Sequence, residues 1–408
     1  MKAYERLLRY ARIHTSSDEK TDTTPSSARQ RDLSLLLEKE MADLGFLDTF
    51  ADEHAYVYGF LPATAGREEE PCIALIAHLD TIPDSDFPGK NVRPQLVPDY
   101  DGGDLLLGES GRVLSPALFP DLKDLKGHTL IVTDGMTILG ADDKAGIAEI
   151  LTACEELLRE KLPHGKIAVC FTPDEEIGHG AALLSLERLG ADFGYTVDGG
   201  GLDQINTETF HAAEAVVSFA GVNVHPGDAK GRMRNASLLA MEFAALLPAA
   251  ERPETTEDHE GFFHLTDMSG SVDRASLNYI IRDHDAAHFA IRKTMMRKAA
   301  DFLNEKYGEG VVTLTVRDQY RNMAEVLEGC PEAAARAEAA IRRAGLTPRR
   351  VPVRGGTDGS QLSYRGLPCP NLGTGGACFH GPYEHISVEN MDLAVRILKN
   401  LLTFADNP

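Results

Sequence analysis

Histidine and acidic side chains stand directly after several short apolar runs of this 408-residue sequence. The first pair follows the run CIALIA (72–77), which continues into His78, Leu79 and Asp80. If the extended backbone persists, positions 78 and 80 project to the same side, because side chains alternate along a strand. The Asp80 carboxylate can then orient the His78 imidazole for metal binding, although an incidental polar pair is the simpler alternative for so short a motif.

Two pairs of neighbouring acids repeat this pattern. Asp142 and Asp143 lie between a small-residue turn and an amphipathic stretch. Acids in the first turn of a helix complement its dipole, which explains one aspartate better than two. Glu175 and Glu176 follow the run KIAVCF (166–171) and a turn at a proline. Neighbouring carboxylates raise each other's pKa unless a cation intervenes, so either a solvated acidic loop or a metal ligand with a free proton carrier beside it is expected.

Asp198 and His380 each stand beside several glycines. Neither Gly-rich segment has a phosphate-loop pattern. Together two imidazoles and three carboxylates form a mixed nitrogen and oxygen set that suits zinc, with cobalt or manganese as alternatives. The set consists of His78, Asp142, Glu176, Asp198 and His380. Five ligands are too many for one catalytic zinc, so we expect two metals that share one carboxylate and keep a position for water.

The elements around these residues predict an α/β domain. Two helices are expected in the first 45 residues, the second capped at Ser26 and Ser27 and ended by Gly45. Short apolar runs at 72–77, 129–132, 166–171 and 195–197 indicate buried strands, and 143–161 has apolar residues at helical spacing. Alternating buried strands and helices are typical of a three-layer α/β fold with a largely parallel sheet.

A segment of different character interrupts this pattern. It contains strand-like runs at 213–221, 275–282 and 311–316 and helical stretches at 235–248 and 285–307. The α/β character returns with helices at 331–344 and from about 388. We therefore expect one domain formed by residues 1–207 and 320–408, with an inserted α+β domain at 208–319.

Composition narrows the class of protein. There are 41 basic and 63 acidic side chains, a formal net charge of −22, which argues against a nucleic-acid partner. No run approaches the roughly 18 consecutive apolar residues of a membrane span, and the first residues lack the apolar core of a signal peptide. The six cysteines have no CxxC spacing, so we expect core residues in a reducing cytoplasm rather than a disulfide or zinc framework.

Longer motifs resemble the peptidase T family, tripeptide aminopeptidases among the co-catalytic dinuclear zinc exopeptidases. The similarity is clearest in AHLDT (77–81), GADDKAG (140–146), FTPDEEIG (171–178), YTVDGGG (195–201), VHPGDAKG (224–231) and RGGTDGSQLS (354–363). The HxD and DEE patterns within these motifs would indicate only the superfamily, whereas VHPGDAKG and RGGTDG are typical of this family. After His380 the sequence reads GPYEH, where the family more often has a basic residue and a histidine before the glutamate. That departure concerns the pocket rim and leaves the ligand intact.

The resemblance implies how the five ligands divide between the metals. It implies that His78 and Asp198 bind one zinc ion, and that Glu176 and His380 bind the other. Asp142 would bridge the two ions. Co²⁺ or Mn²⁺ would be possible substitutes for zinc.

The resemblance also implies roles for five residues that do not bind metal. Asp80 would orient the histidine ligand before it, and Glu175 would be the general base. The inserted domain would be a lid and dimerisation domain, in which His225 supports the oxyanion. Arg282 and Arg354 would bind the terminal carboxylate of the substrate.

The activity implied is release of the N-terminal residue from short peptides, mainly tripeptides. A metal-bound hydroxide would attack the first peptide carbonyl while Glu175 carries the proton. A homodimer through the inserted domain is also implied, and no nucleic-acid or membrane partner is expected. One alternative is a related dinuclear-zinc carboxypeptidase or N-acyl amino-acid deacylase. The other is a catalytically silent metal-binding scaffold, although such proteins usually lose a ligand or the base.

Overall fold

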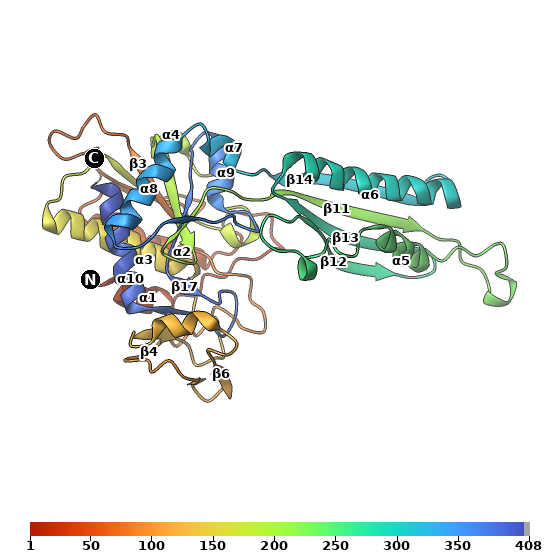
Figure 1. Ribbon diagram of the computed structural model, residues 1–408, viewed down its shortest axis with the longest axis horizontal. Helices are drawn as coiled ribbons and strands as arrows, with labels where there is room; N and C mark the ends of the chain where they lie inside the picture. The colour runs from red at the N-terminus through yellow and green to blue at the C-terminus, as the bar shows by residue number, and fades with distance from the viewer. Residues whose placement is uncertain (404–408) are drawn as a thin grey trace. The chain divides into compact units, whose positions relative to one another are not determined.

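A computed structural model of the chain describes residues 1–403 as two compact units (Figure 1). The first unit comprises residues 1–207, 323–351 and the segment from 357 onward, and the second comprises residues 208–322 and 352–356. Residues 404–408, which close the expected α/β domain, lie outside the described residues. Within residues 1–403, no helix is both long enough and apolar enough to cross a membrane.

An eight-stranded mixed sheet forms the centre of the first unit, in the order β1-β2-β8-β3-β9-β16-β10-β15. The strands are β1 (Leu47–Ala51), β2 (Val57–Leu61), β3 (Ile73–His78), β8 (Ile167–Thr172), β9 (Phe193–Gly199), β10 (Gln204–Asn206), β15 (Arg349–Arg350) and β16 (Asn371–Gly373). The central neighbours β8, β3, β9 and β16 run parallel, whereas β1 and β2 pair antiparallel at one side. Three of the four predicted apolar runs, 72–77, 166–171 and 195–197, therefore form the parallel centre, whereas the run 129–132 lies in a separate antiparallel sheet.

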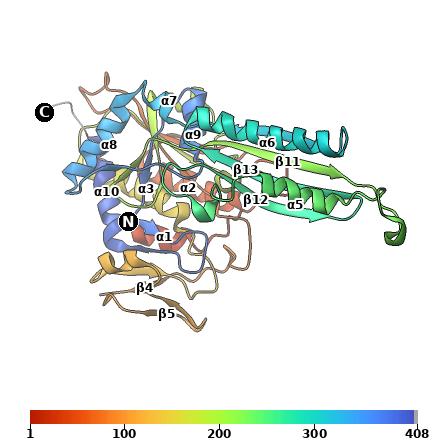
Figure 2. The same ribbon diagram turned by 45° about the vertical axis from the view of Figure 1, so that its right-hand side comes forward.

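Helices cover both faces of this sheet, which confirms the predicted three-layer α/β fold. Ile73, Leu75 and Ala77 of β3 contribute to one core, and the alternate residues Ala74 and Ile76 contribute to the other. The larger core includes α1 (Ala3–Tyr10), α2 (Gln30–Leu44), α3 (Ala141–Glu160), α8 (Pro331–Arg343) and α10 (Val388–Leu402). The smaller core includes α4 (Leu186–Leu189) and α9 (Asp358–Arg365), and α7 (Ala324–Leu327) precedes α8. Figures 1 and 2 show α3 and α10 side by side.

A smaller antiparallel sheet in the first unit was not predicted from the sequence. Its order is β17-β18-β7-β4, from β17 (Gly376–Ala377), β18 (His385–Ser387), β7 (Leu130–Val132) and β4 (Gln95–Val97). The hairpin β5 (Leu105–Leu107) and β6 (Arg112–Leu114) and the 3₁₀ helix η1 (Pro120–Leu125) lie between β4 and β7 in the sequence. Pairing of β18 with β7 joins the end of the chain to its first third.

The helix α2 forms as predicted but begins later. It ends at Gly45, whose left-handed φ of 98° makes a helix C-cap. Ser26 is not its N-cap, because the backbone N and Oγ of Ser26 donate to Asp174 at 2.7 and 2.5 Å. The buried guanidinium of Arg6 in α1 donates to Glu40 of α2 at 2.9 Å and to Glu155 of α3 at 2.7 Å. A charged network therefore joins these three helices.

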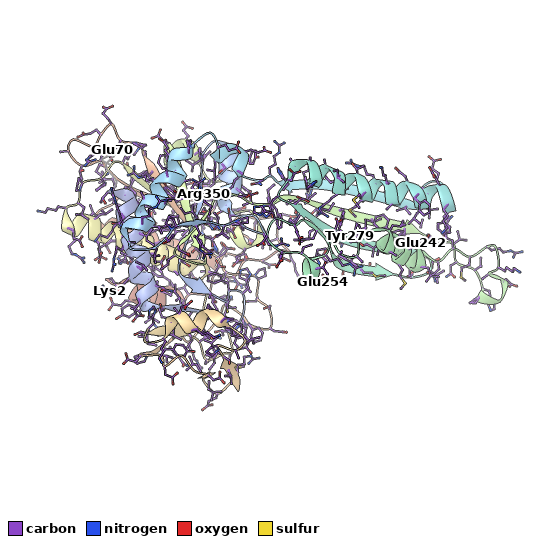
Figure 3. All side chains as sticks on the ribbon, viewed as in Figure 1. Lys2, Glu70, Glu242, Glu254, Tyr279 and Arg350 are labelled. Carbon is purple, nitrogen blue, oxygen red and sulfur yellow. The ribbon has the colours of Figure 1, made fainter. Side chains whose placement is uncertain are left out.

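The second unit is a four-stranded antiparallel sheet with two helices on one face. Its order is β12-β13-β11-β14, from β12 (Phe262–Gly270), β13 (Arg274–Asp283), β11 (His211–Ala220) and β14 (Val312–Tyr320). The helices α5 (Ala236–Leu246) and α6 (Ala286–Tyr307) pack on it, and η3 (Pro226–Asp228) and η4 (Pro253–Thr255) are short 3₁₀ turns. Glu242 of α5 accepts from Lys306 and Tyr307 of α6 at 2.6 and 2.8 Å, and Tyr279 of β13 is buried in the core (Figure 3).

Candidate active site

Three neighbouring parallel strands, β8, β3 and β9, bring four predicted site residues to their carboxyl ends. His78 is the last residue of β3, and Asp198 lies near the end of β9. Glu175 and Glu176 begin the 3₁₀ turn η2 (Glu175–Ile177) shortly after β8. The carboxyl edge of a parallel sheet is where open α/β folds build their sites, because the loops that follow the strands meet there.

Asp142 and His380 reach the same place from loops. Asp142 lies at the kinked start of α3, where its backbone is not helical, and the Asp142–Asp143 peptide bond is cis. His380 lies between β17 and β18 with a left-handed φ of 65°. Asp143 turns away and accepts from the backbone N of His78 at 3.1 Å. One aspartate of the pair thus faces the site while the other fixes the end of β3.

The two carboxylate oxygens of Asp142 face different imidazoles. Oδ1 lies 3.0 Å from Nε2 of His78, and Oδ2 lies 3.2 Å from Nε2 of His380. A further carboxylate faces each ring: Asp198 Oδ1 is 3.6 Å from Nε2 of His78, and Glu176 Oε2 is 3.1 Å from Nε2 of His380. The five side chains predicted to bind metal therefore converge as two groups that share Asp142.

The spacing of these donor atoms suits two divalent cations. Ligands held at about 2.0–2.1 Å from a tetrahedral zinc ion lie roughly 3.3 Å from one another. The nitrogen-to-oxygen separations in the two groups run from 3.0 to 3.6 Å, so little movement would be needed to admit an ion in each. Imidazole nitrogen with carboxylate oxygen is also a donor set that zinc, cobalt and manganese accept.

The pKa values of several ionisable side chains at the site are shifted far from their ordinary values. Burial raises the pKa of Glu176 to about 7, although contact with His380 opposes the shift. Burial, with a contribution from Asp142, raises the pKa of Asp198 to about 6. Hydrogen bonds to Asp142 and Glu176 raise the pKa of His380 to about 11. Three half-buried carboxylates beside two imidazoles hold excess negative charge, which bound cations would neutralise.

Asp80 and Glu175 both lie beside His78. Nδ1 of His78 is 3.0 Å from the Asp80 carbonyl and 3.4 Å from Oδ1 of the Asp80 carboxylate, so Nδ1 carries a proton and Nε2 is directed at the metal ligands. Oδ1 of Asp80 also accepts from the backbone N of Glu175 at 3.0 Å. A carboxylate oxygen of Glu175 lies within 4.8 Å of donor atoms of His78 and Asp198. Burial, reinforced by Asp198, raises the pKa of Glu175 well above its ordinary value.

Sequence reasoning missed two buried carboxylates, Glu384 and Asp358. Glu384 is 2% exposed and accepts from three backbone N–H groups of the turn 139–142, at 2.7, 2.8 and 3.1 Å. It therefore fixes the turn that presents Asp142. Asp358 accepts from Oγ1 of Thr172 at 2.7 Å, and burial raises the pKa of Asp358 to about 7. The available signal was a glutamate shortly after His380 and an aspartate within the RGGTDG motif.

The three residues predicted to bind substrate all belong to the second unit. His225 is exposed just before η3, and its Nδ1 accepts from the backbone N of Gly227 at 3.1 Å. Arg282 of β13 donates through Nη1 to two backbone carbonyls at 3.2 and 3.1 Å and lies over the ring of Tyr320. Arg354 donates through both Nη1 and Nη2 to the loop 256–260, so its guanidinium already has partners within its own unit.

Two groups of imidazole and carboxylate ligands that share one carboxylate form the kind of centre found in two-metal hydrolases. Residues 128–403 match the sequence pattern of peptidase family M20/M25/M40. The chain therefore belongs to peptidase family M20/M25/M40.

Full-length similarity then narrows the comparison within that family. The chain is 50% identical over 407 residues to a peptidase T of an Exiguobacterium species, covering 99% of this chain and 98% of the relative. This result confirms the resemblance to the peptidase T family that the motifs indicated.

Solved structures show the same fold at lower identity. The crystal structure of aminopeptidase PepT from Bacillus cereus matches with a TM-score of 0.78 at 22% identity, covering 98% of this chain and 97% of that chain. A dinuclear metal-binding peptidase of family M20 from Bacillus subtilis matches with a TM-score of 0.62 at 14% identity, covering 98% of both chains.

Proposed function

We propose that this protein is a tripeptide aminopeptidase that uses two divalent cations. Zinc is the metal that we propose for both sites. The observation that carries the proposal is the pair of contacts made by Asp142, whose two oxygens face the imidazoles of His78 and His380 at 3.0 and 3.2 Å. Asp198 would complete the ligands of the first ion and Glu176 those of the second. When bound, two such ions polarise a peptide carbonyl and lower the pKa of water.

Glu175 is the proposed general base. Its carboxylate lies near the first group of ligands without belonging to the five, and its backbone N is held by Asp80 at 3.0 Å. A carboxylate in that position takes a proton from the attacking water and returns it to the amine that leaves. Asp80 acts on the same step indirectly, because it fixes both the imidazole of His78 and the start of η2.

We propose that the second unit selects substrates by the length of the peptide and acts as the lid of a catalytic first unit. His225 would support the oxyanion, and an arginine would bind the terminal carboxylate of the peptide. Arg282 is the stronger candidate of the two arginines. It donates through Nη1 alone within residues 1–403, whereas Arg354 donates through both terminal nitrogens.

We also propose a homodimer formed through the second unit. Its two helices leave large apolar side chains exposed, among them Leu238 and Met241 of α5 and Ile291 and Phe302 of α6. Sedimentation of the purified protein tests the dimer: the double substitution Leu238→Glu and Met241→Glu should yield monomers if α5 lies in the interface.

The cytoplasm is the proposed compartment, because all six cysteines are free thiols.

Glu175→Gln tests the catalytic assignment. Loss of a general base should reduce kcat by about 10²–10⁴-fold while both metals remain bound. Glu187→Gln is the matched control, since Glu187 is an exposed acid in α4. Near-normal turnover by Glu175→Gln, with metal content unchanged, would remove Glu175 from the mechanism.

Substrate class is tested with free and N-acetylated tripeptides alongside di- and pentapeptides. The proposal expects rapid release of the first residue from free tripeptides and little cleavage of blocked ones. Preferred cleavage of N-acylated substrates would instead identify a deacylase or carboxypeptidase. No turnover on any substrate in zinc-, cobalt- and manganese-loaded protein would identify a silent scaffold.

A further inference from the structure

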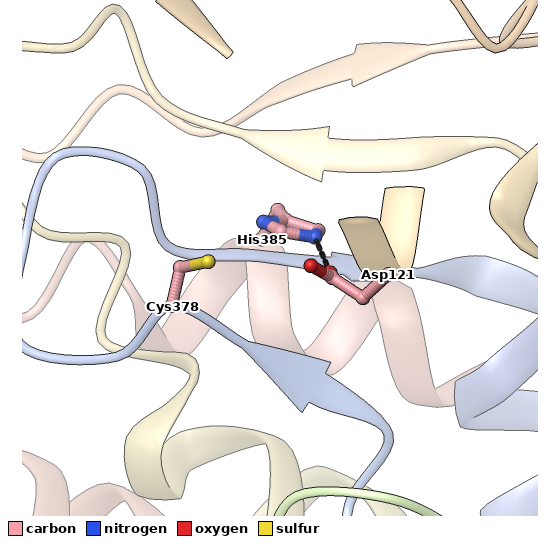
Figure 4. Close-up of side chains that lie close together, drawn as sticks. All are labelled: Asp121, Cys378 and His385. Atoms are coloured by element: carbon pink, nitrogen blue, oxygen red, sulfur yellow. Dashed lines mark hydrogen bonds and ion pairs between the residues drawn. The ribbon is translucent and has the colours of Figure 1, made fainter. Parts of the chain in front are cut away.

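A second cluster of metal-binding side chains lies in the first unit, apart from the five ligands. It consists of Asp121, Cys378 and His385 (Figure 4), whose donor atoms all lie within 4.8 Å of one another. Asp121 lies in η1, Cys378 follows β17 and His385 begins β18. Because Ala377 pairs with His385 across the β17–β18 hairpin, the backbone brings the thiol and the imidazole together.

The hydrogen bonds of His385 orient it as a ligand. The imidazole is fully buried, and its Nδ1 lies 2.8 Å from the carbonyl oxygen of Tyr383. A carbonyl only accepts, so Nδ1 carries a proton. Nε2 lies 2.8 Å from Oδ2 of Asp121, which also accepts, so a proton or a cation must lie at this contact. A metal-bound histidine typically donates its other N–H to a backbone carbonyl in this way.

The donor set differs in kind from that of the candidate active site. A thiol, an imidazole and a carboxylate together suit a thiophilic divalent cation, whereas the five ligands contain no sulfur. As thiolate and carboxylate, Cys378 and Asp121 would balance the charge of a dication beside the buried ring. Asp121 is 44% exposed and Cys378 is half-buried, so an ion can enter and keep water as a further ligand.

The other cysteines do not share this setting. Cys72, Cys154, Cys170 and Cys369 are buried, and Cys330 is half-buried. Within residues 1–403, Cys378 is the one cysteine found in a group of three or more potential metal ligands. The sequence led us to expect a small core residue at every cysteine, and Cys378 departs from that expectation.

We propose that Asp121, Cys378 and His385 bind one thiophilic divalent cation of the Zn²⁺ and Cd²⁺ class, at a third metal site separate from the proposed pair. The segment 378–385 carries both His380 and Glu384, and Cys378 and His385 are its ends. An ion at this site therefore ties both ends of that segment to η1. Its role is to hold in place the loop that presents His380.

Cobalt titration of metal-free full-length protein tests the site, with Co²⁺ alone as the probe. Thiolate-to-cobalt charge transfer gives a strong near-ultraviolet band that nitrogen and oxygen ligands do not give. The proposal expects about three Co²⁺ ions to bind per chain. The final intensity of the band should correspond to one thiolate-bound Co²⁺ per chain. Cys378→Ser should abolish the band and lower the total to two, whereas Cys330→Ser should leave both unchanged.

Two results would overturn the proposal: no thiolate band in the unmodified protein, or a band that survives Cys378→Ser. If the variant does not fold, alkylation of the unmodified protein decides the question. Cd²⁺ should slow labelling of Cys378 and leave that of Cys330 unchanged, and equal labelling rates with and without Cd²⁺ would contradict the site. Failure here is separable from failure of the proposed function, because the thiolate band does not depend on peptide hydrolysis.

Discussion

Glu384→Gln is the sharpest test of how the buried shell supports the proposed metals. One oxygen of Glu384 accepts two backbone N–H groups and the other accepts the N–H of Asp142 at 3.1 Å. A glutamine must turn an NH₂ group toward at least one of those donors. Loss of a hydrogen bond to a charged acceptor costs about 1.5–3 kcal/mol. Loss of an outer-shell partner typically lowers metal affinity 10–100-fold, which is about 1.4–2.8 kcal/mol, so the two estimates agree.

The assay is competition for zinc between the metal-free protein and a chelator of known affinity, with kcat measured on the reloaded enzyme. We expect the weaker of the two zinc sites that share Asp142 to lose 10–100-fold in affinity. Glu389→Gln is the matched control, because Glu389 is an exposed glutamate of α10 that also accepts a backbone N–H, from Thr129 at 2.9 Å. Affinities within twofold of the unmodified protein, or equal losses in both variants, would refute the role assigned to Glu384.

Three further predictions concern stability, each measured by urea unfolding of chelator-treated protein. Burial alone would lower the pKa of His385, but contacts with Asp121, Cys378 and the Tyr383 carbonyl together outweigh burial and raise this pKa to about 9, above an unfolded value of about 6.5. The contribution of the protonated imidazole to the free energy of unfolding is therefore full below pH ~6.5 and is lost as the pH rises through about 9. His385→Gln should then cost up to about 3 kcal/mol more at pH 6 than at pH 10. An equal cost at both pH values would contradict this. Arg6→Ala should cost about 1.5–3 kcal/mol, because it removes the buried hydrogen bond to Glu40 while Arg9 still pairs with the other Glu40 oxygen, and a cost under 1 kcal/mol would show that the network is dispensable. Gly146→Ala places a Cβ 2.0 Å from the carbonyl of Val197 and should cost about 1–3 kcal/mol or more, whereas unchanged stability would mean that α3 moves freely against β9.

The parallel strands at the centre of the sheet, and the site residues at the ends of those strands, could be predicted because their signals in the sequence are local. Each strand is a continuous apolar run, and β3, β8 and β9 each end at or just before acidic or histidine residues. Parallel strands then carry those residues to one edge, so convergence of His78, Glu176 and Asp198 follows from the fold class. His380 joined the set by residue type alone, and only the family resemblance implied which ion it binds, because nothing local in a Gly-rich loop fixes its direction.

The features that sequence reasoning missed depend on contacts between distant residues. The run 129–132 was predicted as a strand and forms β7, but its partners in the small sheet are only two or three residues long, too short for a periodic signal. Strand β12 is exposed after Phe263, so it shows no buried alternation. Ser26 reads as a helix cap, yet it donates to Asp174, which lies 148 positions away. Glu384 is a similar case, because its partners are backbone amides that no side-chain pattern reveals.

The order of segments along the chain has a consequence for how the protein is made. Four of the five proposed ligands precede residue 208, where the second unit begins, and the last, His380, follows that unit. Strand β16, which separates β9 from β10 in the sheet, is likewise synthesised late. A nascent chain on the ribosome therefore cannot enclose both ions until the intervening unit has emerged. Premature termination within that unit would leave a fragment that lacks both His380 and β16, and therefore a sheet and a ligand set that are incomplete.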